Sequence, residues 1–351
     1  MKTPTRKYTR AKLWQFANTF YGLKSPNDLA DLLRLEKKDF RWLTDCPSYD
    51  VFEMPKKRGG FRTIENPAEP LKKTQKWLNF YLKACYYFSK TTASYGFITT
   101  TTEETKPRDI KTNAQQHRGR PWMLNIDFKE FFHQVSYNRV VEIFEDQPFG
   151  FSEELSHTLA KLTTYQNRLP MGTATSPVLS NFACTSLDAD LLTHARLNRQ
   201  TYTRYADDLT FSGHEEISYA DTQALIDRCQ IHGFAVNLNK VQVFSPADTK
   251  IVTGLVVGDT AVSLPPDYLP KLRAEMGKLS ALHELKYRMG GFSADWMTRY
   301  KQKIKGSIAF VGFVNGKHDA EYLILNAEFA GITTTTDHFD PVSWLDFGYQ
   351  F

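Results

Sequence analysis

Two adjacent acidic residues between β-forming stretches constrain this chain more than any other feature. Asp207 and Asp208 interrupt residues 201–213, TYTRYADDLTFSG, which predict a strand, a tight turn and a second strand. Such a turn forces one carboxylate to the tip of a hairpin, and clustered carboxylates need a cation to offset their repulsion. An ordinary polar turn also accommodates Asp-Asp. The pair therefore indicates either a cation site or a simple turn.

A third acid ends another predicted strand. The segment MLNIDF, residues 123–128, is short and apolar and carries Asp127 near its end. Two acid sites about 80 residues apart, each at a strand end, can converge in one sheet, as in a two-metal nucleotidyl-transfer site. Asp127 could instead cap a helix formed by the residues that follow it. If the three acids converge, we expect them to hold metal ions and to be catalytic.

A loop of small residues leads into a predicted helix. The loop is LPMGTATSP, residues 169–177, and the helix covers 176–196 with Pro177 in its first turn. Backbone N–H groups at such a helix start can meet a phosphate or a forming base pair. A plain turn with a helix cap explains the same residues equally well.

The remaining segments mix helices and strands and predict an α+β fold. A Gly-Gly turn in KKRGGFRTIENP indicates a hairpin over residues 56–67. Strands are expected over 233–245 and 250–257. Helices are expected over 10–43, 69–88 and 267–314. Within the first range a new helix is expected to start at Ser25-Pro26, and the third range is broken at Gly290-Gly291.

Charge is unevenly placed along the chain. The net charge is +5, yet residues 1–90 hold 19 Lys and Arg against 9 Asp and Glu, and residues 266–305 hold 9 against 4. Residues 317–351 hold 1 against 6 and are rich in aromatics. Basic blocks suit a polyanionic partner, although solvated helix faces carry the same charges.

The composition argues against a disulfide scaffold and against a membrane partner. The four cysteines form no CxxC pair, which makes a cysteine-rich zinc site improbable. No apolar run approaches the roughly 18 residues of a membrane span, and the N-terminus lacks a secretory signal. A reducing, cytoplasmic location is expected.

Taken together and in this order, the segments resemble the palm motifs of reverse transcriptases. These segments are DFKEFF, LPMGTATSP, YADD and NLNK. NAQQH (113–117) and VTG (252–254) narrow the resemblance to the retron type of bacteria. The hairpin 56–67, SYGF (94–97) and KGSIAF (305–310) resemble further elements of the fingers and thumb, so the likeness covers about residues 50–316.

The resemblance implies a right-hand polymerase with an assigned catalytic centre. Asp127, Asp207 and Asp208 match the catalytic acids, which together with the backbone carbonyl of Phe128 would hold two Mg²⁺ ions. Phe132 matches the aromatic residue that excludes the 2′-hydroxyl of a ribonucleotide.

Further residues are assigned to the incoming dNTP. Arg62, with Lys56 or Lys57, matches the cations that grip the triphosphate. Lys240 is a candidate proton donor to the diphosphate, although a solvated lysine at a strand end is an equally good interpretation.

One residue of the small-residue loop departs from the family. Met171, beside Gly172, stands where many reverse transcriptases have Gln. Because a thioether cannot donate a hydrogen bond, contact with the nucleotide there must be apolar.

Recognition of a structured RNA is implied for two further elements. The residues concerned are Asn113, His117, Val252, Thr253 and Gly254. For His117, a hydrogen-bonded histidine in a packed loop is an equally good interpretation.

The resemblance also implies a domain order. We expect an N-terminal helical segment (1–50), fingers with part of the palm (51–120), palm (121–265), helical thumb (266–316) and an acidic aromatic tail (317–351).

The implied function is RNA-directed DNA synthesis on a cognate non-coding RNA. A guanosine 2′-hydroxyl would prime it, giving a branched RNA–DNA molecule (msDNA) within an anti-phage system. Expected partners are a toxin or effector protein and a host RNase H. The alternatives are another bacterial reverse transcriptase, group II intron-like or defence-associated, and a non-catalytic RNA-binding scaffold.

Overall fold

The computed structural model describes residues 8–56, 59–289 and 294–334, which form two compact units. The first unit runs to Thr253 and the second begins at Gly254. Within the described residues, no helix is both long and apolar enough to cross a membrane.

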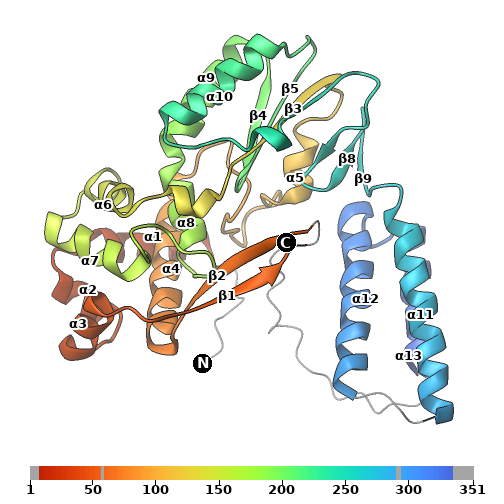
Figure 1. Ribbon diagram of the computed structural model, residues 1–351, viewed down its shortest axis with the longest axis horizontal. Coiled ribbons are helices and arrows are strands. Elements are labelled where there is room, and N and C mark those ends of the chain that lie inside the picture. Colours follow the sequence, from red (N-terminus) through yellow and green to blue (C-terminus); the bar gives the residue numbers. More distant parts are fainter. Residues whose placement is uncertain (1–7, 57–58, 290–293, 335–351) are drawn as a thin grey trace. The chain divides into compact units, whose positions relative to one another are not determined.

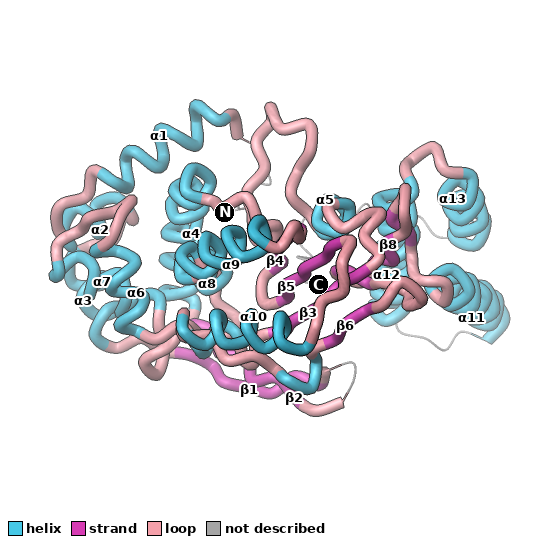
Figure 2. The backbone as a smooth tube through the Cα atoms, turned by 90° about the horizontal axis from the view of Figure 1, so that it is seen from above, coloured by secondary structure: helices cyan, strands magenta, loops and turns pink. Residues whose placement is uncertain are grey.

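The first unit contains a four-stranded antiparallel sheet (Figure 1, Figure 2). Its strand order is β4-β5-β3-β6. The strands are β3 (Trp122–Asp127), β4 (Thr201–Tyr205), β5 (Asp208–Gly213) and β6 (Gln242–Phe244). Strands β4 and β5 are consecutive in the chain, whereas β3 comes from far upstream, so the sheet brings the two acidic segments together.

Ten helices of the first unit are described, and they surround this sheet and an adjoining core. Their bounds are α1 (Arg10–Tyr21), α2 (Pro26–Leu32), α3 (Lys37–Asp45), α4 (Glu69–Ser89), α5 (Ile110–Gln115), α6 (Tyr137–Glu145), α7 (Glu153–Thr163), α8 (Ser176–Ala183), α9 (Thr185–Leu197) and α10 (Tyr219–Ile231). Two short 3₁₀ helices, η1 (Phe131–Gln134) and η2 (Leu238–Lys240), and strand β7 (Ile251–Val252) complete the unit with the hairpin described below.

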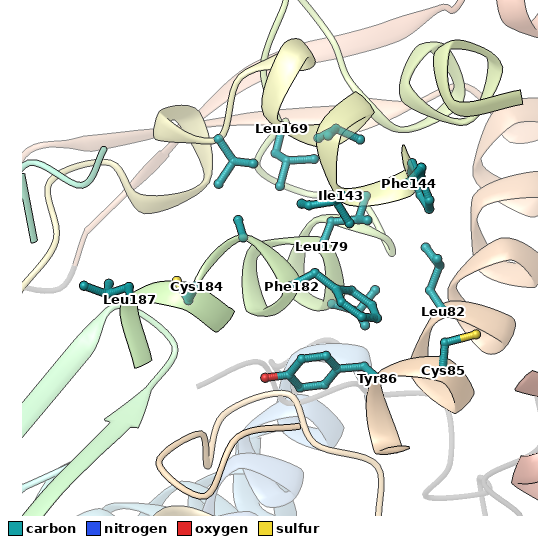
Figure 3. Close-up of a cluster of buried hydrophobic side chains, with 14 of the residues drawn as sticks. Leu82, Cys85, Tyr86, Ile143, Phe144, Leu169, Leu179, Phe182, Cys184 and Leu187 are labelled. Atoms are coloured by element: carbon teal, nitrogen blue, oxygen red, sulfur yellow. The ribbon is translucent and has the colours of Figure 1, made fainter. Parts of the chain in front are cut away.

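Helix α8 packs between α4 and α6 (Figure 3). Phe182 of α8 meets Tyr86 of α4 edge to face, with ring centroids 4.9 Å apart. Leu179, also on α8, is fully buried beside Ile143 and Phe144 of α6. Because α8 follows the small-residue loop directly, this packing fixes where the loop ends.

The predicted hairpin and helix starts are confirmed. Strands β1 (Tyr49–Pro55) and β2 (Phe61–Pro67) pair antiparallel around the Gly-Gly turn. Ser25 caps α2 and forms a capping box with Asp28, with Pro26 at the first helical position.

Three predicted elements are shorter or more divided than expected. The helix predicted over 176–196 divides at Cys184 into α8 and α9. The strand predicted over 250–257 turns at Thr253 and Gly254, both with positive φ. Residues 233–245 contain η2 and the short β6 in place of two full strands.

The second unit combines a small hairpin with three helices. Its elements are β8 (Leu255–Val257), β9 (Val262–Ser263), α11 (Tyr268–Met289), α12 (Ala294–Asn315) and α13 (Ala320–Thr334). Gly312 of α12 leaves room for the ring of Tyr322 on α13, because an added Cβ would come within 2.5 Å of that ring. Arg273 of α11 pairs with Glu321 of α13 at 2.6 Å. Helix α13 therefore belongs to this bundle, although it lies within the segment that the sequence assigned to the tail; residues 335–351 lie outside the described residues.

Gly96 allows the backbone of its segment to lie directly against the turn that carries Asp207. A Cβ on Gly96 would lie 2.5 Å from the backbone nitrogen of Ala206 and 3.2 Å from the carbonyl carbon of Tyr205. Asn181 of α8 donates a hydrogen bond to the Gly96 carbonyl at 3.0 Å. The backbone of residues 94–97 is thus held directly against the turn.

We expect Gly96→Ala to destabilise the protein by about 1–3 kcal/mol, because backbone atoms on both sides must move apart. The measurement is the midpoint of urea unfolding. Gly213→Ala in β5 is the matched control, since its added Cβ meets nothing closer than 3.4 Å. Equal midpoints for the two variants would contradict the close approach at Gly96.

Candidate active site

Two of the three acids lie directly opposite each other in the central sheet. Asp127, the last residue of β3, pairs in register with Asp208, the first residue of β5. Asp207 sits in the two-residue turn between Tyr205 and Asp208. The N–H of Phe128 donates to the carbonyl of Asp207 at 3.1 Å, which ties that turn to the end of β3. The predicted convergence of the two acidic segments is therefore present in the backbone.

The turn between the strands is held in an uncommon backbone conformation. Ala206 has φ +57°, in the left-handed region that a residue with a Cβ seldom adopts. Its carbonyl accepts a hydrogen bond at 3.1 Å from Nη1 of Arg204. Nη1 also donates to Oδ1 of Asn181 at 3.0 Å. A buried guanidinium thus fixes the peptide that precedes Asp207.

Arg204 is in turn fixed by a buried acid on α9. Its Nε and Nη2 donate to the two carboxylate oxygens of Asp188, both at 2.8 Å, and both side chains are fully buried. Tyr202 and Thr91 donate their hydroxyl groups to the same carboxylate, at 2.9 and 2.8 Å. This two-pronged pairing leaves the guanidinium little freedom to rotate.

The acids at the strand ends repel one another. Burial, together with the negative charges of Asp207 and Asp127, raises the pKa of Asp208 to about 7. Burial and the charge of Asp127 also raise the pKa of Asp207. The positive charges of Lys240 and Arg62 oppose this rise at Asp207, which shows that both cations act on the site. The site therefore holds more negative charge than its own cations neutralise.

Lys240 is the nearest cation. Its Nζ lies 2.8 Å from Oδ1 of Asp127. The N–H of Asn237, in the same NLNK segment, donates to the backbone carbonyl of Asp127 at 2.8 Å. The segment is therefore anchored to the end of β3 by its backbone and by this side chain.

The donor set fits a divalent cation of the hard, oxygen-preferring kind. Carboxylate oxygens are the ligands that such ions take, and desolvation together with the neighbouring carboxylates raises the pKa of Asp207 and of Asp208. Across the described ranges, no three His, Cys, Asp or Glu side chains are already arranged around a common metal position. The carboxylate of Asp127 is paired with Lys240 instead.

The residues expected around the nucleotide sit on three different segments. Phe132 lies in η1, with its ring centroid 6.2 Å from that of Phe97 in the SYGF segment. Arg62 is exposed on β2, opposite Met54. Lys56 is exposed at the end of β1, and Lys57 lies outside the described residues.

Met171 and Gly172 lie against the hairpin. The carbonyl of Met171 accepts from the N–H of Glu65 at 2.7 Å. Gly172 has φ +121°, and an added Cβ would lie 2.9 Å from Cγ2 of Ile64. This combination of positive φ and close approach requires glycine.

The expected RNA-contacting residues are mostly buried. His117 is enclosed, with Nδ1 2.7 Å from Oγ of Ser212 and Nε2 2.8 Å from Oγ1 of Thr203. Burial lowers its pKa to about 3, so the ring is neutral. In this arrangement neither ring nitrogen is open to RNA, and His117 instead joins the end of α5 to β4 and β5.

The NAQQH and VTG segments, both expected to recognise RNA, are linked through α5. Asn113 and Val252 are each 1% exposed. Oγ1 of Thr253 donates to the carbonyl of Ile110 at 3.0 Å, which links the VTG segment to the helix carrying NAQQH. Gly254 has φ +80° and begins the second unit.

Sequence reasoning did not single out Arg204, Asp188 or Glu65. Arg204 directly precedes the Tyr-Ala-Asp-Asp segment, and a charged residue inside an apolar strand signals a buried partner. That signal could have identified Arg204, but it does not say which acid is the partner.

Asp208→Asn should stabilise the metal-free protein at high pH. The folded state binds the Asp208 proton with a pKa of about 7, above the usual value near 3.9, so ionisation costs stability progressively from about pH 4 to pH 7 and fully above it. Asn removes that cost.

The measurement is the difference in Tm between variant and wild type with chelator present. We expect a gain of a few degrees at pH 8 and almost none at pH 5. Adding a divalent metal at pH 8 should raise Tm of the wild type more than that of the variant. A gain that is the same at both pH values would contradict repulsion among these acids.

Comparisons with known proteins agree with this geometry. The family model described as reverse transcriptase (RNA-dependent DNA polymerase) matches residues 54–312. The retron Ec86 reverse transcriptase of Escherichia coli is 30% identical over 276 residues, which cover 75% of this chain and 82% of that protein. The retron Mx65 reverse transcriptase of Myxococcus xanthus is 34% identical, over 64% of this chain and 55% of that protein. The retron Mx162 reverse transcriptase of Myxococcus xanthus is 29% identical, over 84% of this chain and 65% of that protein.

Among solved structures, telomerase from Candida albicans in complex with a fragment of telomeric RNA aligns with a TM-score of 0.45 and 12% identity, covering 85% of this chain and 64% of that one. The family match spans the strands that carry the three acids and reaches into α12. The expected right-hand polymerase fold and RNA-directed DNA polymerase activity are thereby confirmed, with an RNA template as partner and a divalent metal as the family's usual cofactor. The chain belongs to the reverse transcriptases and, within them, to the retron type.

Proposed function

We propose that this protein copies its own structured non-coding RNA into DNA that stays joined to the RNA as a branched msDNA. The observation that carries the proposal is the meeting of Asp127 and Asp208 across β3 and β5, with Asp207 in the adjoining turn. The similarity to retron reverse transcriptases supports the retron-specific part, including priming from a guanosine 2′-hydroxyl.

The catalytic assignment follows from the chemistry of the three acids. Asp127, Asp207 and Asp208, with the backbone carbonyl of Phe128, would hold two Mg²⁺ ions. Two such ions would lower the pKa of the attacking hydroxyl and neutralise the departing diphosphate. Arg62 and Lys56, with Lys57, would bind the triphosphate, and Phe132 would exclude a ribose 2′-hydroxyl.

Lys240 has two successive roles in this proposal. In the metal-free protein its ammonium neutralises Asp127 at 2.8 Å. With a metal ion held by Asp127, this ammonium would be available to donate a proton to the diphosphate. The exposed position of Lys240 supports such a movement.

The domain assignment follows the polymerase plan. We assign fingers to 51–120, palm to 121–265 and thumb to the helices from residue 266 onward, after an N-terminal helical segment. The contacts of α13 with α11 and α12 support extending the thumb to Thr334, past residue 316. The contact between Thr253 and Ile110 supports a joint RNA-recognition role for the VTG and NAQQH elements.

The biological setting is proposed from the same family. The RNA–DNA–protein complex would act in the cytoplasm in anti-phage defence, restraining a toxin or effector protein, and a host RNase H would remove template RNA. Sequencing the nucleic acid that copurifies tests the proposal. A single branched RNA–DNA species supports it, whereas RNA without attached DNA favours a scaffold.

Asp207→Asn should abolish DNA synthesis and leave RNA binding intact. Loss of a metal-binding carboxylate should lower the rate by about three orders of magnitude or more. Primer extension and copurified RNA are measured together. Asp227→Asn, an exposed acid on α10, is the control and should keep full activity. A folded Asp207→Asn protein that still makes DNA would refute the assignment.

Phe132→Ala should admit ribonucleotides. Removing the ring should raise the ratio of rNTP to dNTP incorporation by about ten-fold or more, because the space denied to the 2′-hydroxyl opens. Single-nucleotide kinetics measure this ratio. Phe88→Ala on α4, the same truncation on another helix, should leave it unchanged. An unaltered ratio in Phe132→Ala would remove Phe132 from this role.

A further inference from the structure

A buried carboxylate in the β1–β2 hairpin joins three other segments at one point. Glu65 is 1% exposed. Its Oε1 accepts a hydrogen bond from Nη2 of Arg168 at 2.9 Å. Its Oε2 accepts from the backbone N–H of Met171 at 3.0 Å and lies 3.2 Å from Nε2 of His133. The donors come from the turn after α7, the loop before α8, and η1.

The backbone of Glu65 reinforces the link to the loop. Its N–H donates to the carbonyl of Met171 at 2.7 Å, so Met171 is held by one residue at both its N–H and its C=O. Gly172 follows with φ +121° and lies close to Ile64. The loop therefore cannot slide along β2 without breaking both hydrogen bonds.

The donors around Glu65 are themselves fixed to the chain. The backbone of Arg168 exchanges hydrogen bonds with Tyr165 across a tight turn. The next residue, Leu169, donates its N–H to the carbonyl of Val135 at 3.0 Å, just after η1. His133 directly follows Phe132. Glu65 is thus the common acceptor for segments that carry Phe132 and Met171, and it lies three residues from Arg62.

We infer that Glu65 is a positioning residue that sets the shape of the dNTP pocket and so its selectivity. The inference rests on the proposed roles of Arg62, Phe132 and Met171. The thioether of Met171 cannot donate a hydrogen bond to the nucleotide, so discrimination at that position depends on where the backbone is held. Glu65 supplies that constraint and does not itself touch the substrate.

The test is Glu65→Gln, which keeps the size of the side chain. Its amide NH₂ replaces one acceptor oxygen, so at least one of the buried donors loses its partner. Incorporation of dTTP on poly(rA)·oligo(dT) is measured, together with misincorporation of dCTP. We expect the KM for dTTP to rise about ten-fold, kcat to change by less than about three-fold, and misincorporation to rise.

Glu53→Gln is the matched control, because Glu53 is an exposed acid on β1 of the same hairpin. It should change neither KM nor misincorporation. If Glu65→Gln does not fold, Arg168→Lys replaces it, since it keeps the charge but loses the planar fork.

Each outcome decides the inference. A folded variant with wild-type KM and misincorporation overturns it, and so does a fall in kcat alone. A rise in KM and misincorporation supports it. Failure of the wild type to extend the primer would instead count against the proposed function.

Discussion

The geometry of the catalytic turn depends on one buried ion pair, Arg204 with Asp188. Burying two charges is costly, and the cost is offset only when every polar atom finds a partner. Here the carboxylate accepts four hydrogen bonds, two from the guanidinium and one each from Tyr202 and Thr91. The guanidinium has one nitrogen left for the turn, and it binds the carbonyl of Ala206. The left-handed conformation of Ala206 persists because this network over-determines it.

Repulsion among acids destabilises the end of the sheet that carries Asp127, Asp207 and Asp208. Burial and mutual repulsion raise the pKa of both Asp207 and Asp208. The same repulsion would favour the binding of the metal ions proposed above. Lys240 reduces the repulsion in the metal-free protein without closing the site, since its side chain remains exposed and can leave. Lys240 thus reduces the electrostatic repulsion among the three acids in the metal-free folded state.

Local features were predictable from the sequence, and features that depend on distant partners were not. The turn at Asp207 and Asp208, the Gly-Gly hairpin and the start of α2 at Ser25 follow from neighbouring residues. The inward position of His117 depends on Ser212 and Thr203, each more than 80 residues away. The division of the helix at Cys184 lies within a continuous helical pattern, and no local signal marks it. The three acids were proposed as catalytic because their order matches a family, whereas the acceptor role of Glu65 depends on contacts up to 106 residues distant.

Three acids of the first unit differ in the number of hydrogen-bond donors that surround each carboxylate. Asp188 and Glu65 are both enclosed, and each carboxylate is matched by an arginine and by further donors. Asp208, by contrast, is exposed at the start of β5, and the described part of the chain provides it with no ion pair. Desolvation and the neighbouring carboxylates raise its pKa to about 7. A carboxylate whose hydrogen bonds are complete fixes the backbone around it, as Asp188 does beneath Ala206 and Glu65 does beside Met171. A carboxylate left short of positive charge must obtain it from outside the chain. Acidic residues therefore occur both in the structural framework and in the candidate active site. The number of hydrogen-bond donors around each carboxylate distinguishes the two roles.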